Sequence, residues 1–258
     1  MQHVLQDGTL AAFGLFMTRT SAFVLATPFF GAQTTFGGVK IGLIASLTLV
    51  LYSVHGVPLP GAEEPLEFGV LAMREVLVGL ALAFVMQAVL LAVRTAGELL
   101  ASEMAFNMAS SADPATGSSS PLITQFYEML FLLGLLAVDG HHLLLRALAD
   151  SYDRVPVGHL SLPPGYLDLA LRLTSDMIAA GVTFLGPVLM LLLLSSVVIG
   201  LIARAVPQVN VLEMGFSLRI LVGLGAMVTF TPLIAPALQR LYVYLDQGLE
   251  AALVALAS

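Results

Sequence analysis

Cysteine is absent from this chain, and charged residues are scarce. Without a thiol, neither a disulfide framework nor a cysteine-ligated metal site can form. Only 10% of the 258 residues are charged, whereas a soluble domain usually carries about 25%. Hydrophobic residues make up 58% of the chain. This composition is typical of a membrane protein.

The chain also lacks two features, a block of basic residues and the cationic region of a signal peptide. The formal net charge is -7 and no block of basic residues is present, so nucleic acid is not expected as a partner. The N-terminal stretch MQHVLQDGTLAAF lacks the cationic region of a signal peptide. We therefore expect the first helix to remain in the mature protein.

The motifs of common enzymes are also missing. The chain contains no HExxH, GxSxG or GxxxxGKS/T, and no GxGxxG in a strand-turn-helix setting. His141 and His142 are adjacent, and successive helix positions point about 100° apart, so the pair is not expected to chelate one ion. We therefore expect a protein without enzymatic activity, metal site or cofactor.

Long apolar runs make up most of the chain. A helix that spans a bilayer needs about 20 mostly apolar residues, and such runs occupy 10–30, 39–57, 68–93, 122–138, 177–203 and 215–245. None of them alternates with period two, as the strands of a membrane barrel do. The sequence predicts an all-α, polytopic membrane bundle of about six helices.

Proline and glycine add local detail to this bundle. Pro187, Pro232 and Pro236 fall inside the last two runs, so these runs should be bent. Gly38 and Gly42 are small residues four positions apart, a spacing that lets two helix backbones approach closely.

Charges inside the apolar runs are functional candidates, because an unpaired charge in hydrocarbon costs several kcal/mol. Arg19 lies in the first run and is compatible with two interpretations: a contact to another subunit or an aqueous path, or pairing with a carboxylate of the same chain. Arg74 and Glu75 are neighbours and should face different ways, each needing its own partner. Arg94 and Glu98 are four apart and could pair on one helix face.

The segment MAFNMASSADPATGSSSP, residues 104–121, joins soft apolar side chains to a run of small, turn-forming residues. Taken alone, such a segment is typical of a solvated, flexible loop. The alternative is a deformable seal, because methionine is unbranched and conforms to irregular gaps.

Five stretches in the same order resemble one known family. They are RTSAFVLATPFFG, VKIGLIASLTL, EMAFNMASSADPATG, DGHHLLLRALADSYDRVPVG and RAVPQVNVLEMGFSLRILVG. Together they resemble the R-type subunit of the type III secretion export gate, the FliR/SctT family. The form DGHHLLL is most similar to flagellar members.

The resemblance implies an architecture and a set of partners. Residues 1–176 would form a P-type-like helical part with a plug loop at 104–121, and residues 177–258 a Q-type-like helical hairpin. The subunit would pack with the P-type and Q-type membrane subunits around the entrance of a channel for unfolded proteins. The B-type subunit would contact it from the cytoplasm. Its place would be the bacterial inner membrane, in the flagellar basal body.

The resemblance also assigns roles to individual residues. The pore plug would consist of Met104, Phe106, Asn107, Met108, Asp113, Pro114 and Gly117. The tip of the hairpin would face the cytoplasmic partner through Arg204, Pro207, Gln208 and Asn210. A cytoplasmic tip and six spans place both termini on the periplasmic side. The plain alternative for the tip is a capped turn, since Pro207 ends a helix and amides cap freed backbone groups.

A secondary transporter of a small solute is the alternative function. Transporters of this size commonly show two related halves with interrupted helices at matching positions. Proline interrupts helices here, but no matching halves are seen in the sequence.

Overall fold

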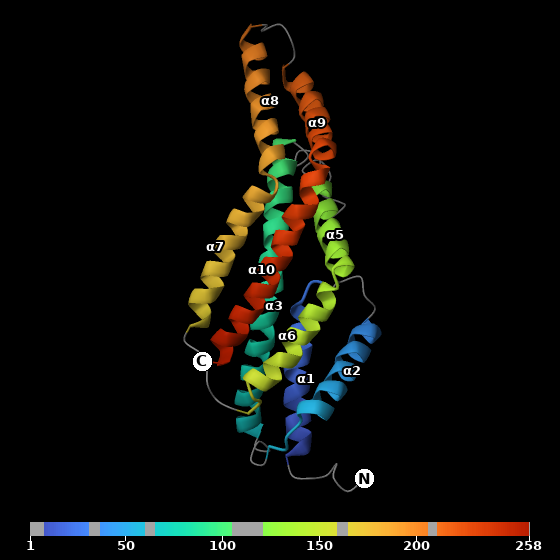
Figure 1. Cartoon of the computed structure of the whole chain (residues 1–258), viewed down its shortest axis with the longest axis vertical. Helices are drawn as coiled ribbons and strands as arrows, with labels where there is room; N and C mark the ends of the chain where they lie inside the picture. Colours follow the sequence, from blue (N-terminus) through green and yellow to red (C-terminus); the bar gives the residue numbers. More distant parts are fainter. Residues whose placement is uncertain are drawn as a thin grey trace. The chain divides into compact units, whose positions relative to one another are not determined.

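The computed structural model describes residues 8–30, 37–59, 65–104, 121–158, 165–205 and 211–257. Within these ranges the regular structure is helical, without strands. Figure 1 labels the helices, which are α1 Thr9–Ala26, α2 Gly37–His55, α3 Pro65–Glu103, α5 Leu122–Ala137, α6 Gly140–Arg154, α7 Tyr166–Phe184, α8 Gly186–Ala205, α9 Val211–Thr229 and α10 Thr231–Ala257. The predicted all-α class is confirmed.

Some of the predicted apolar runs differ from the observed helices in length or in number. In the described ranges, α1, α2, α3 and α8 are long and apolar enough to cross a membrane, and the number of spans reaches 6 if α5 with α6 and α9 with α10 each count as one. Helix α6 is not among the predicted apolar runs, because Arg146, Asp150 and Asp153 interrupt its apolar positions. Helix α3 continues to Glu103, ten residues past the predicted end at residue 93.

Proline positions coincide with the breaks in the last helices. Helix α8 begins at Gly186, just before Pro187, and α10 begins at Thr231, just before Pro232. Proline is tolerated in a first helical turn because the amide hydrogen it lacks has no acceptor there. The expectation that these runs are not straight rods is confirmed. Pro236 differs, since it lies inside α10.

The chain divides into two compact units, and the first takes in the described parts of Met1–Ala88, Val138–Thr174 and Tyr244–Ser258. Helix α1 turns one face inward, with buried residues three or four apart as a helix buried along one side requires. An aromatic cluster fills part of this core. The rings of Phe16 and Tyr152 stack at 4.4 Å, and Tyr52 meets Phe13 and Phe16 edge-on at 5.5 and 5.4 Å.

The second unit takes in the described parts of Val89–Ala137 and Ser175–Val243. In this unit α8 and α9 contact each other as a helical hairpin (Figure 1). The Tyr242 hydroxyl donates a hydrogen bond of 3.1 Å to the carbonyl of Phe131, and their rings lie 5.4 Å apart. Tyr127 and Phe184 meet edge-on at 6.0 Å.

Gly79 marks the place where α3 crosses α1 most closely in the first unit. A Cβ atom at this position would lie 2.5 Å from the Arg19 carbonyl oxygen and 2.9 Å from the Ala22 Cβ. Both helices must therefore separate to admit any side chain. We expect Gly79→Val to lower the free energy of unfolding by about 1–3 kcal/mol, measured as thermal unfolding of the purified chain in detergent.

Gly42 is the matched control, because nothing lies within 4 Å of a Cβ built at that position of α2. Gly42→Ala should leave the isolated chain as stable as the original, or more stable by the about 0.5–1 kcal/mol by which alanine favours a helix over glycine. Equal losses in the two variants would contradict the close crossing.

Candidate functional site

Arg19 and Glu75 are the most deeply buried charges in the described part of the chain, each with 0% of its surface exposed. Arg19 Nε donates to Glu75 Oε2 at 2.6 Å, and Arg19 Nη2 lies 2.6 Å from the same oxygen. The carboxylate partner therefore comes from the same chain. This resolves the alternatives left open by the sequence in favour of an internal pair.

The remaining donors of Arg19 are satisfied at the end of α6. Nη1 donates to the Ser151 carbonyl at 2.8 Å, and Nη2 to the Val155 carbonyl at 2.9 Å. The carbonyls at the end of a helix carry partial negative charge, so a cation stabilises them, although the Ser151 carbonyl also accepts the Val155 N–H at 3.0 Å. The guanidinium also lies 4.5 Å from the centre of the Tyr152 ring, within the range of a cation–π interaction.

Glu75 is shared between two arginines. Arg74 Nη1 lies 3.0 Å from Glu75 Oε1 and donates a second bond of 3.1 Å to the Pro156 carbonyl. The expectation that Arg74 and Glu75 face different ways was wrong, because they pair with each other. Each also has a partner of its own, Arg19 for Glu75 and the Pro156 carbonyl for Arg74. The Cβ atoms of Arg74 and Glu75 diverge, but the long arginine side chain reaches round the helix to the neighbouring carboxylate. The three charges hold α1, α3 and the end of α6 together within the first unit.

Chemically, this network is suited to holding helices and not to catalysis. Thr20 and Tyr152 share a hydrogen bond of 3.0 Å, and the Tyr152 hydroxyl also lies 3.0 Å from the Phe16 carbonyl. The Glu75 carboxylate faces the two arginines, and the hydroxyls face each other or the backbone, in a closed interior. Tyr152 and Ser151 could not be identified from the sequence, because their role depends on the end of a helix that is 132 residues from Arg19.

Arg94 pairs with a different residue from the one predicted. Its Nε donates to Glu128 Oε1 of α5 at 2.6 Å, within the second unit. Glu98 is exposed one turn further along α3. The prediction of an Arg94–Glu98 pair was wrong, because the cation-first order on a helix is weak and a carboxylate on the adjacent helix offers a closer approach.

Of the predicted plug residues, only Met104 falls within the described ranges. It has 0% of its surface exposed and its N–H bonds to the Leu100 carbonyl at 2.9 Å. Its thioether packs on Gly223 of α9, where a built Cβ would lie 2.6 Å from Sδ. Outside the described residues lie Phe106, Asn107, Met108, Asp113, Pro114 and Gly117.

The predicted hairpin tip is also described only in part. Arg204 is exposed in the last turn of α8. Pro207, Gln208 and Asn210 lie outside the described residues. Between α8 and α9, the chain therefore presents a cation next to the predicted turn.

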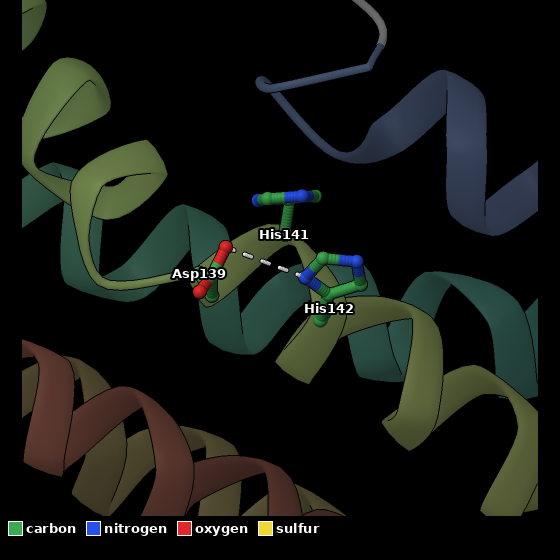
Figure 2. A group of neighbouring side chains, drawn as sticks. All are labelled: Asp139, His141 and His142. Atoms are coloured by element: carbon green, nitrogen blue, oxygen red, sulfur yellow. Dashed lines mark ion pairs between the residues drawn. The ribbon is translucent and has the colours of Figure 1, made fainter.

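A third group of polar side chains lies at the start of α6, where Asp139, His141 and His142 come together (Figure 2). The two imidazole rings lie 4.0 Å apart, and His142 Nδ1 is 3.6 Å from Asp139 Oδ1. The rings extend beyond Cβ, so the two imidazoles lie closer together than the divergent Cβ directions suggested. The expectation that the pair does not chelate one ion stays a sequence-based prediction.

Two apolar helices have few partners within the chain. Only 17% of the apolar window is buried in α2, and the same fraction in α8. Among the exposed residues are Val39, Ile41 and Leu49 on α2, and Met190, Leu194 and Val197 on α8. These faces need lipid or another apolar protein surface to cover them.

Known proteins are similar in sequence to this chain over most of its length. The model of the family "Bacterial export proteins, family 1" matches residues 10–244. The flagellar biosynthetic protein FliR of Escherichia coli K12 is 31% identical over 229 residues, which cover 88% of this chain and 86% of that protein. The FliR of Bacillus subtilis is 34% identical over 214 residues, 82% of each chain, and that of Aquifex aeolicus 24% identical over 234 residues, 91% and 90%.

Proposed function

The chain belongs to the bacterial export proteins, family 1, which it shares with the flagellar biosynthetic protein FliR, and on this premise we propose how it acts in export. It is a membrane subunit of the flagellar protein export apparatus, and not an enzyme. Its membrane is the bacterial inner membrane. The finer role proposed is that of one wall of the channel entrance for unfolded proteins, together with the plug that closes it.

This proposal rests on the small buried fraction of α2 and α8. Both helices are apolar enough to span a membrane, yet only 17% of each apolar window is covered by the chain itself. Gly38 and Gly42 leave open space along α2, as a site for close helix packing requires. P-type and Q-type subunits are the proposed partners on these faces. In this proposal residues 1–176 form the P-type-like part and residues 177–258 the Q-type-like hairpin.

Closure is proposed to come from the stretch that follows Met104. An unfolded polypeptide needs a lumen and a closure but no sequence-specific pocket. Met104 is fixed in the core of the second unit, so it supplies an anchor for this stretch. Phe106 and Met108 then act as the seal, since soft side chains conform to an irregular pore. Asn107, Asp113, Pro114 and Gly117 provide the turns of the plug.

The tip between α8 and α9 is proposed to face the cytoplasm. The exposed Arg204 ends α8, and Pro207, Gln208 and Asn210 follow it in sequence. They would contact the B-type subunit, in addition to capping the turn. A cytoplasmic tip and six spans place both termini in the periplasm.

The test is to purify the tagged chain from its native membrane in mild detergent. We expect the P-type and Q-type subunits at a fixed ratio, with the B-type subunit attached. Gln208→Ala with Asn210→Ala should keep the first two and lose the B-type subunit, because only the tip contact is removed. Gln247→Ala, an exposed amide of α10, is the matched control and should lose nothing. A lone particle that binds a small solute would favour a transporter instead.

A further inference from the structure

The export role proposed above makes no use of the group of Asp139, His141 and His142 (Figure 2), and the chemistry of this group points to a ligand. We propose that these three side chains form a binding site for one divalent transition-metal ion of the zinc class. The site lies entirely within the first unit, at the turn that begins α6.

The distances between the donor atoms place this site close to a coordinating geometry. One donor atom from each residue lies within 4.8 Å of the other two. Zinc binds imidazole nitrogen and carboxylate oxygen at about 2.0–2.2 Å, so two ligands of one tetrahedral ion lie about 3.4 Å apart. The gap between His142 Nδ1 and Asp139 Oδ1 is already 3.6 Å. Asp139 and His142 are exposed, so rotation of their side chains can close the remainder.

His141 supplies an independent reason to expect a ligand. Its Nδ1 is buried and has no hydrogen-bond partner among the described residues. A buried polar atom without a partner is uncommon, since its desolvation is not offset. The Phe29 ring stacks on the His141 imidazole, with 6.4 Å between the ring centres. A bound cation would satisfy the nitrogen that the protein leaves unpaired.

Asp139 has an unusual backbone conformation for the residue that precedes a helix. It precedes α6 at the N-cap, where an aspartate normally accepts a hydrogen bond from the first backbone N–H groups. No such side-chain bond is made here, and the backbone is left-handed with φ 56° and ψ 26°. Among the described residues it is the one non-glycine with positive φ. The carboxylate is thereby turned toward His142.

The donor set selects the kind of metal. Two imidazoles and one carboxylate suit zinc, cobalt or nickel, whereas magnesium and calcium prefer oxygen ligands alone. The chain has no cysteine, so thiolate-dependent metals are not expected. Three protein ligands leave at least one position for water. Arg146 lies one turn beyond His142 on α6, and its positive charge disfavours a bound cation. The negative charge of the Asp139 carboxylate offsets this repulsion.

The experiment measures Zn²⁺ binding to the full chain, purified in detergent without a polyhistidine tag, by equilibrium dialysis and calorimetry. We expect one ion per chain. His142→Gln and His141→Gln should each weaken binding by at least about tenfold, as losses of metal-supporting groups commonly do. Co²⁺ in place of Zn²⁺ should give a visible absorption band that disappears in the same variants.

Two further variants separate ligation from folding. Asp139→Gly keeps the positive φ that glycine adopts freely but removes the carboxylate, so it should fold normally and bind more weakly. His55→Gln is the matched control, because His55 Nε2 also lies near a carboxylate, 3.2 Å from Asp153 Oδ1, but His55 belongs to no group of three potential metal ligands among the described residues. Unchanged Zn²⁺ affinity in His142→Gln, equal loss in His55→Gln, or no binding by the original chain would each overturn the proposal.

Discussion

Replacing Glu75 with glutamine is expected to be the most destabilising single change in the first unit. The substitution removes the one carboxylate that lies against both Arg19 and Arg74, which have 0% and 5% of their surfaces exposed. Arg19 then loses its carboxylate partner in the closed interior, and Arg74 loses its contact to Glu75. Breaking a buried pair costs on the order of 3–5 kcal/mol, so the Tm of the purified chain should fall sharply and its level in the membrane should drop.

Companion variants distinguish a charge effect from a packing effect. Arg19→Met leaves Glu75 paired with Arg74 and should cost less than Glu75→Gln. The double variant Arg19→Met with Glu75→Gln should be more stable than Glu75→Gln alone, because it also removes the buried Arg19 cation that the single variant leaves without its carboxylate. Additive losses would show that the three charges do not act as one network.

Deleting residues 106–117 is expected to have the largest effect on the cell. In the proposed gate this stretch is the closure, so the assembled complex should remain while its lumen stays open to ions. We expect the inner membrane to become permeable to protons and small cations, with growth inhibited once the truncated chain is produced. Uptake of protons by intact cells, followed with a pH-sensitive dye, measures the leak.

The leak should depend on an assembled pore and on soft apolar side chains. Producing the truncated chain in cells that lack the P-type subunit should abolish the leak, since no complete lumen forms. Phe106→Ser with Met108→Ser keeps the length of the stretch and should leak to an intermediate degree. If the deletion complex copurifies intact and the membrane stays tight to ions, the stretch is not the closure.

Apolar run length and proline placement were enough to predict most of the helices. Within a bilayer the backbone groups of a long apolar run must bond to each other, so most of these runs form helices. Pro187 and Pro232 coincide with observed breaks. Helix α6 is missing from the predicted apolar runs because its exposed face is charged, so its stability comes from packing of one face and not from overall hydrophobicity. Length alone could not find it.

Partners of buried charges were beyond what the sequence could predict. Arg19 had 17 acidic residues to choose among, and only the packing of α1 on α3 brings Glu75 to it. Cβ directions of neighbouring residues did not predict that Arg74 pairs with Glu75, nor that the rings of His141 and His142 lie 4.0 Å apart. In each case long side chains or rotating rings overcome the direction that the backbone gives to Cβ.

The internal pairing of Arg19 has a consequence for biosynthesis. Glu75 follows it by 56 residues and the Ser151 carbonyl by 132, so the first helix leaves the ribosome long before either acceptor is made. A lone guanidinium is costly within hydrocarbon. The nascent first helix must therefore wait at the insertion machinery or at the lipid headgroups until the third helix arrives, which makes insertion of these two segments a coupled event.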